Sequence, residues 1–130
     1  TTTSYGTFPI WHKDADLCMF DLSTGTQVPT EEANSPDTDS YHSWSSNSKW
    51  VVFSSRRLDG LYTRPFIAHV GEGGILSKPF VLPQKSTDYY TLLTKSYNIP
   101  EFVKGKVKTD TYKLVSQIKE GKNRKISFTK

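Results

Sequence analysis

The stretch that most constrains the fold of this chain is residues 40–57, SYHSWSSNSKWVVFSSRR. A short β-prone run around Trp44 leads into four polar turn residues, and the apolar run 50–53 follows at once. Turn residues between two β-rich runs predict an antiparallel hairpin. A second turn at 58–60 and another β-prone run at 61–70 add a third strand. We therefore predict an all-β, mainly antiparallel fold.

A fourth strand completes this unit. Its strands are expected at about 41–45, 49–55, 61–70 and 78–82. A weak repeat connects the unit to the preceding part of the chain, because FDL at 20–22 lines up with AHV at 68–70, a spacing of 48 residues. Units of roughly 40–50 residues with four short strands are typical of β-propeller blades.

The chain is too short to close a propeller ring. A blade takes about 40–45 residues and a ring at least four blades, so about 160 residues are needed, whereas this chain has 130. We expect one to two four-stranded propeller-type blades, completed by the remaining blades of a larger propeller or by a homo-oligomer. The expected divisions are a partial blade at 1–39, a complete blade at 40–84, a helix and loop extension at 85–103 and a basic C-terminal tail at 104–130.

The segments after the blade favour short helices. Range 86–93 opens with Ser-Thr-Asp, which can cap a helix. A second helix is expected further on, with Tyr112, Val115 and Ile118 on one face at helical spacing and a glycine as its stop. Alternation in 126–128 predicts a final strand. An N-terminal strand is also expected in 1–12, and another in 16–22.

Charge is unevenly distributed along the chain. Residues 1–103 carry a net charge of −3 and residues 104–130 carry +7, which together give the +4 of the whole chain. A basic tail can bind nucleic acid or another anionic surface. A solvated terminal segment is the commoner case, so nucleic acid is not the expected partner. No run approaches about 18 apolar residues, so no transmembrane segment is expected.

The order of motifs resembles that of a known repeat. Residues 44–60 contain, in this order, Trp-Ser, a polar turn, Lys-Trp, an apolar run, Ser-Ser-Arg-Arg and Asp-Gly. This order is similar to one blade of the TolB-like, or PD40, family of WD40-like β-propellers of Bacteroidetes type. The resemblance spans about residues 5–103, and the phrases that carry it are WHKDADL at 11–17, SYHSWS at 40–45, FSSRR at 53–57, KPFVLPQ at 78–84 and SYNIPEF at 96–102. It implies a periplasmic or cell-envelope protein, lipid-anchored or secreted in its full form, and supplies no catalytic residues.

Two histidines stand next to tryptophans and near carboxylates. If inner strands of neighbouring blades meet, His12, Asp14, Asp16 and His42 converge. Imidazole with carboxylate could hold a metal ion, but no zinc-type spacing is present, so no metal is expected. A hydrogen-bond network that satisfies buried polar groups within the blade is the preferred interpretation.

Charged residues after the apolar run form the candidate ligand patch, which comprises Arg56, Arg57, Asp59 and Arg64. Successive strand residues point to opposite faces, so only one of the two adjacent arginines can face the core side. That arginine is expected to pair with a carboxylate such as Asp39 or Asp59. The other could bind a carboxylate, phosphate or peptide terminus at the rim.

Aromatic residues leave two functions open. Trp11, Trp44 and Trp50 could stack on sugar rings, although strand tryptophans more often form the core between blades. A glycan site would need Trp11 or Trp44 beside Asp14 or Asp16 in an open concavity.

Several enzyme signatures are absent from the sequence. There is no Gly-x-Ser-x-Gly elbow, no Cys-x-x-Cys-His haem motif and no complete dinucleotide loop. Cys18, the single cysteine, is expected to be a buried small hydrophobe. The leading hypothesis is a non-enzymatic binding or scaffolding module, without a cofactor, that contacts a protein or peptide. The alternative is a glycan-binding or glycan-processing propeller.

Overall fold

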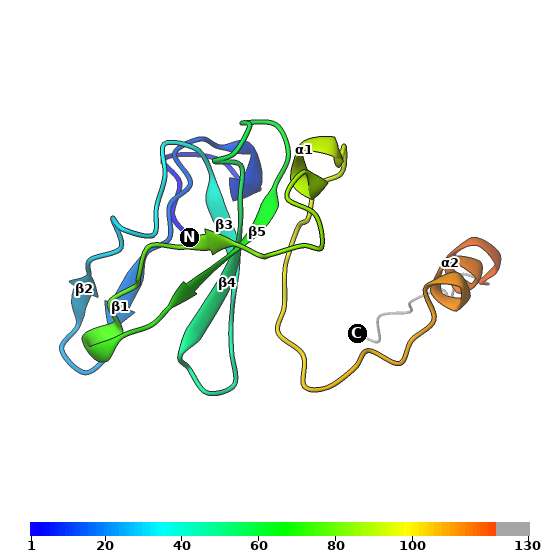
Figure 1. The fold of residues 1–130 in the computed structure, drawn as a ribbon. Helices are drawn as coiled ribbons and strands as arrows, with labels where there is room; N and C mark the ends of the chain where they lie inside the picture. Colours follow the sequence, from blue (N-terminus) through cyan, green and yellow to red (C-terminus); the bar gives the residue numbers. More distant parts are fainter. Residues whose placement is uncertain (122–130) are drawn as a thin grey trace, which may run out of the picture.

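Two antiparallel sheets make up the body of the protein (Figure 1). The computed structural model describes residues 1–121. One sheet has two strands, β1 and β2, and the other has four strands in the order β3-β4-β5-β6. Their bounds are β1 Met19–Asp21, β2 Thr26–Val28, β3 Asp39–Trp44, β4 Trp50–Ser55, β5 Arg64–His69 and β6 Phe80–Val81. This confirms the predicted all-β, mainly antiparallel class and the four consecutive strands of the second unit.

The β3-β4 hairpin forms because its turn satisfies its own polar groups. The Ser45 N–H donates to the Trp50 carbonyl at 2.9 Å, which closes the loop. The Asn47 Oδ1 accepts from the Ser45 hydroxyl at 2.7 Å and from the Lys49 N–H at 3.1 Å. An Asn side chain that bonds to nearby backbone stabilises a turn in this way. The turn predicted from the polar residues 46–49 is therefore confirmed.

The hydrophobic core lies between one face of the larger sheet and the N-terminal unit. Paired residues of neighbouring strands share a face, and Phe53 of β4 pairs with Phe66 of β5. Their rings stack with centroids 6.2 Å apart. Leu17 and Ala33 of the N-terminal unit are buried in the same cluster. Burial of one sheet face against a second layer is what makes a small β domain stable.

The N-terminal region differs from the prediction. Instead of a strand within 1–12, the chain forms a single 3-10 turn, η1 (Pro9–Trp11), preceded by Phe8 at a φ of 60°. Proline fixes its own φ and suits the first turn of a helix, which explains why this segment leaves the extended conformation. The strand expected at 16–22 is also shorter, because Met19–Asp21 pairs with β2 whereas Asp16 makes only an isolated bridge to Thr2.

Buried Arg64 holds the helical part of the C-terminal extension to the sheet, and Ser54 and Thr63 bind its later part, residues 96–98. Helix α1 (Tyr89–Leu92) is only four residues long. The guanidinium of Arg64, 1% exposed, donates to the carbonyls of Tyr90 at 2.9 Å, Leu93 at 2.8 Å and Lys95. Carbonyls at the end of so short a helix have few partners of their own. The side chain on β5 therefore supplies the donors that hold this helical part in place.

Helix α2 (Thr111–Glu120) confirms the second predicted helix. The Asp110 side chain caps its first turn by accepting from the Tyr112 N–H at 2.9 Å, and Gly121 is its C-cap. Figure 1 shows the helix standing off the body at the end of an extended segment. The expected strand at 126–128 lies outside the described residues. Over residues 1–121, neither α-helix has the length and apolar character needed to cross a bilayer.

Replacement of Arg64 by Lys should loosen the C-terminal extension. An ammonium cannot reach the separate carbonyls that the guanidinium fork reaches together, so local opening of 89–98 should become easier by about 2 kcal/mol. Hydrogen exchange of the backbone amides measures this opening. Arg56→Lys is the matched control, because Arg56 bonds no carbonyl of this segment. Unchanged protection of 89–98 in Arg64→Lys would contradict the assigned role.

Candidate functional site

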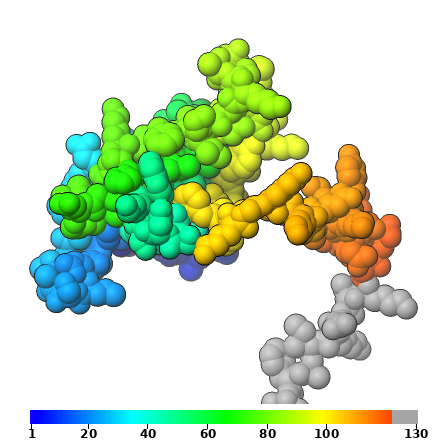
Figure 2. Space-filling view, turned by 60° about the horizontal axis from the view of Figure 1, so that its bottom comes forward, coloured from blue at the N-terminus to red at the C-terminus, as the bar shows by residue number. Residues whose placement is uncertain are grey.

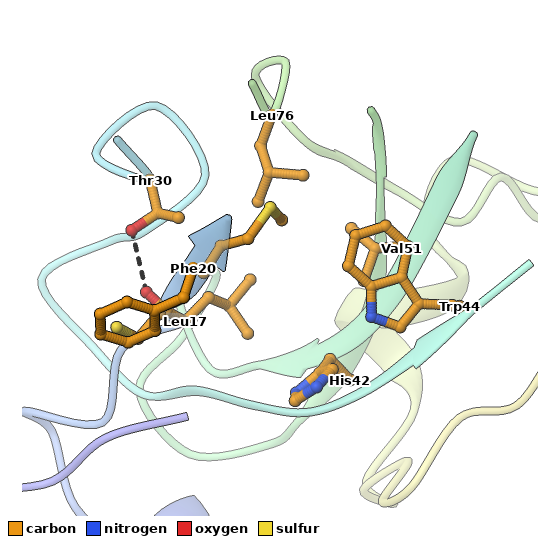
Figure 3. Close-up of a pocket in the computed structure, with 9 residues that line it drawn as sticks. Leu17, Phe20, Thr30, His42, Trp44, Val51 and Leu76 are labelled. Atoms are coloured by element: carbon orange, nitrogen blue, oxygen red, sulfur yellow. Dashed lines mark hydrogen bonds between the residues drawn. The ribbon is translucent and has the colours of Figure 1, made fainter. Parts of the chain in front are cut away.

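A hollow of about 150 Å³ lies between the N-terminal hairpin, β1-β2, and strands β3 and β4 of the larger sheet. It contains two of the predicted candidates, His42 and Trp44. Figure 3 shows Leu17 and Phe20 on one side of the hollow, with Trp44 and Val51 facing them. The full lining is Leu17, Cys18, Met19, Phe20, Thr30, His42, Trp44, Val51 and Leu76. We call this hollow the Trp44 pocket.

The floor of the Trp44 pocket is apolar and its rim is open to water. Leu17, Val51 and Leu76 are buried, whereas Trp44 and Phe20 are 42% and 56% exposed. The one buried hydroxyl is already satisfied, because Thr30 Oγ1 donates to the Leu17 carbonyl at 2.9 Å (Figure 3). A cavity of this volume with aliphatic and aromatic walls holds a group the size of a benzene ring.

A bulge in β3 turns Trp44 toward the pocket. Ser40 pairs with Ser54 and Trp44 pairs with Val51, with a register shift between Ser40 and Ser43. In a regular strand, residues four apart share a face, yet Ser54 and Val51 lie on opposite faces of β4. The extra residue therefore moves Trp44 to the face of Val51. Tyr41, at a φ of 51°, is where the backbone makes this change.

His42 sits at the mouth of the Trp44 pocket. Partial burial lowers the pKa of its imidazole, and the nearby positive charge of the N-terminus lowers it further. Both effects disfavour the protonated ring. His42 is therefore neutral at pH 7 and can donate one hydrogen bond and accept another beside an apolar hollow.

The adjacent arginines both form ion pairs within the body. Arg57 binds Asp39 with an N–O distance of 2.6 Å, and the Asp39 side chain is completely buried. The same guanidinium donates to the Ala33 carbonyl at 2.6 Å and lies 4.7 Å from the centre of the Phe66 ring. Arg57 is thus the arginine on the core side, and Asp39 is one of the two partners expected for it.

The other arginines of the patch are also paired. Arg56 approaches Asp37 at 3.5 Å, and Arg64 approaches Asp59 at 3.6 Å. Asp37 was not expected as a partner, although its place in an Asn-Ser-Pro-Asp turn close to Asp39 could have suggested it. A shallow hollow beside Arg56, Arg57 and Asp59, which Lys13 also lines, remains open to solvent, but the two arginines and Asp59 are each held in an ion pair.

The four residues that were expected to converge, His12, Asp14, Asp16 and His42, do not lie together. Asp14 accepts hydrogen bonds from the Ser4 N–H at 2.8 Å and from its hydroxyl, which lowers the pKa of Asp14. Burial raises the pKa of Asp16, and the charges of Asp39 and Asp14 raise it further. His42 lies apart from them in the Trp44 pocket. Within residues 1–121, no three His, Cys, Asp or Glu side chains are placed to hold a metal ion.

His12 and Trp11 have separate surroundings. The His12 Nε2 lies 3.1 Å from the Thr7 carbonyl, and its ring meets Tyr5 edge-on at 4.6 Å. Trp11 is 73% exposed and borders a small hollow of about 130 Å³ that also includes Arg56. Neither Asp14 nor Asp16 lines this hollow or the Trp44 pocket.

No model of a protein family, no curated protein and no solved structure matches this chain.

Removal of the Asp39 carboxylate should destabilise the fold strongly. Asp39→Ala leaves the Arg57 guanidinium buried without its counter-charge, which costs about 3–5 kcal/mol in the free energy of unfolding. Urea denaturation measures this loss. The pair Asp39→Leu with Arg57→Met should recover most of it, because apolar groups of similar size need no counter-charge. A double variant no more stable than Asp39→Ala would contradict this account.

The pH dependence of His42 has a definite sign. An NMR titration should place its pKa below the ordinary 6.5. The folded state then binds the proton less tightly than the unfolded chain, so the contribution of His42 to the free energy of unfolding should rise with pH between the lowered pKa and 6.5 and stay level at lower and at higher pH. His42→Gln should flatten that slope. A ring pKa at or above 6.5 would refute the prediction.

Proposed function

We propose that this chain is a non-enzymatic binding or scaffolding module of a TolB-like β-propeller protein at the bacterial cell envelope, on its periplasmic side. In this proposal β3–β6 form one blade, and the β1-β2 hairpin belongs to a neighbouring blade. The partner is a protein or peptide that meets the module at β3.

The architecture supports the blade assignment in two ways. A four-stranded antiparallel sheet whose strands follow chain order is the repeating unit of a propeller, and β3-β4-β5-β6 has that form. In a propeller, successive blades also pack face to face. Leu17 and Met19 of the N-terminal unit pack on the face of the sheet that carries Phe53 and Phe66, as residues of a preceding blade would.

The observation that carries the binding proposal is the position of the Trp44 pocket beside an end strand. Within residues 1–121, β3 pairs along its length with β4 alone, and on its other edge the Asp39 N–H donates to the Ala15 carbonyl at 2.7 Å. An extended peptide can add to the edge of such a sheet, and a neighbouring hollow then selects one of its side chains. The ring-sized apolar floor fits an aromatic or branched aliphatic side chain.

The surroundings of the charged candidates favour binding over sugar chemistry. Arg57 and Arg64 form buried structural contacts, and Asp14 is hydrogen-bonded to Ser4. A glycan-processing site would place a carboxylate beside Trp44 or Trp11, whereas the walls next to Trp44 are aliphatic and aromatic. The peptide hypothesis therefore has the better support.

N-acetyl-phenylalanine amide is the probe that tests this proposal. It should shift the NMR signals of Leu17, Val51 and Leu76 saturably, with a Kd of about 1 mM, as expected for a ligand of this size. His42→Trp should block the mouth of the pocket and abolish the shifts. His69→Trp, which changes an exposed histidine outside the pocket, is the control. Scattered, non-saturating shifts, or shifts unaffected by His42→Trp, would reject the proposal.

A further inference from the structure

Helix α2 presents an apolar face to solvent. Tyr112 and Ile118 are 85% and 80% exposed, and Leu114 and Val115 are about half exposed. Residues three and four apart lie on one side of a helix, so these four side chains form a single stripe. Figure 2 shows the helix, in orange, held clear of the body by the segment that precedes it. Among residues 1–121, no other element covers the apolar side of this amphipathic helix, which usually packs against a second layer.

Lysines lie in this helix and in the segment just before it. Five of them lie between residues 104 and 120: Lys104, Lys106, Lys108, Lys113 and Lys119. The two acidic residues of the same segment already have helix partners. Asp110 caps the first turn through the Tyr112 N–H, and Glu120 accepts from the Ser116 hydroxyl at 3.2 Å. The net charge of this segment is +3, against −3 for residues 1–103.

We propose that residues 104–120 bind the surface of an anionic lipid bilayer. In this arrangement α2 lies in the plane of the interface, with Tyr112, Val115 and Ile118 among the headgroups and upper acyl chains. A helix of ten residues is too short to cross a bilayer, and an apolar face with lysines next to it favours a position in the plane of the interface. The lysines that precede the helix contact the negative surface from the water side.

The charge distribution agrees with this orientation. The body carries net negative charge and is repelled by an anionic surface, whereas the extended segment before α2 gives it room to stay in solution (Figure 1). A nucleic-acid partner would neutralise the lysines equally well. It would leave the stripe of Tyr112, Leu114, Val115 and Ile118 in water, so the exposed apolar area favours the bilayer.

Co-sedimentation with lipid vesicles tests the proposal. The protein should bind vesicles of phosphatidylcholine with phosphatidylglycerol, bind much more weakly to phosphatidylcholine alone, and be released by raised salt. Each lysine near the surface contributes about fivefold to the partition coefficient, so Lys104→Gln with Lys106→Gln and Lys108→Gln should weaken binding by about 100-fold. The matched control replaces the exposed body lysines Lys78, Lys85 and Lys95 by Gln and should leave binding unchanged.

A second variant separates the bilayer from other polyanions. Ile118→Asn with Tyr112→Ser removes apolar surface and leaves every lysine in place, so it should weaken vesicle binding at least tenfold. Binding to a single-stranded oligonucleotide, measured by fluorescence anisotropy, should be weaker than vesicle binding. Equal vesicle binding by this variant, tighter binding to the oligonucleotide, or no difference between anionic and neutral vesicles would overturn the proposal.

Discussion

The buried ion pair between Asp39 and Arg57 determines how the parts of this protein meet. Asp39 also accepts from the Ser35 N–H at 2.6 Å and the Ser35 hydroxyl at 2.8 Å, which fixes the connection that leads into β3. Arg57 reaches the Ala33 carbonyl and lies over Phe66. One interaction thus joins the N-terminal unit, the first strand of the sheet and the end of β4. Since Asp39 is completely buried and Arg57 largely so, each charge depends on the other.

This anchor explains why the N-terminal hairpin lies where it does. Ala33 is held at the edge of the core by its carbonyl contact with Arg57, and the chain before it returns across the sheet face with Leu17 facing Phe53. The Trp44 pocket is the space left between this returning chain and β3. Its position follows from the ion pair and from the bulge, and its volume depends on both.

The sequence was informative where structure is local. The β3-β4 turn could be predicted because Asn47 bonds to its own neighbours, and α2 could be predicted because apolar residues at helical spacing are followed by a glycine. The prediction of an N-terminal strand was wrong because the backbone restriction at Pro9 outweighed the strand preference of the apolar residues around it. An ion pair between one of Arg56 and Arg57 and a carboxylate such as Asp39 or Asp59 was expected, and the structure shows it as Arg57 with Asp39. The hydrogen bonds of Arg64 were not expected, because their acceptors are backbone carbonyls, which the sequence does not distinguish from one another. The pocket was not predicted either, since its walls are separated along the chain and a bulge leaves no mark in an alternation pattern.

The bulge at Tyr41 has a consequence for how this surface could change. Successive residues of a strand point to alternate faces of the sheet. One extra residue therefore reverses the face of every later side chain up to the next turn. If the Asp39–Arg57 pair keeps the start of β3 in place and the β3-β4 turn changes its register, deletion of a single residue near Tyr41 sends the indole of Trp44 to the opposite side of the sheet while every pocket-lining side chain keeps its identity. Chain length at this point, more than residue type, decides whether the hollow has its aromatic wall. Related chains could therefore gain or lose the site by insertion and deletion alone, and substitution patterns would not reveal the event.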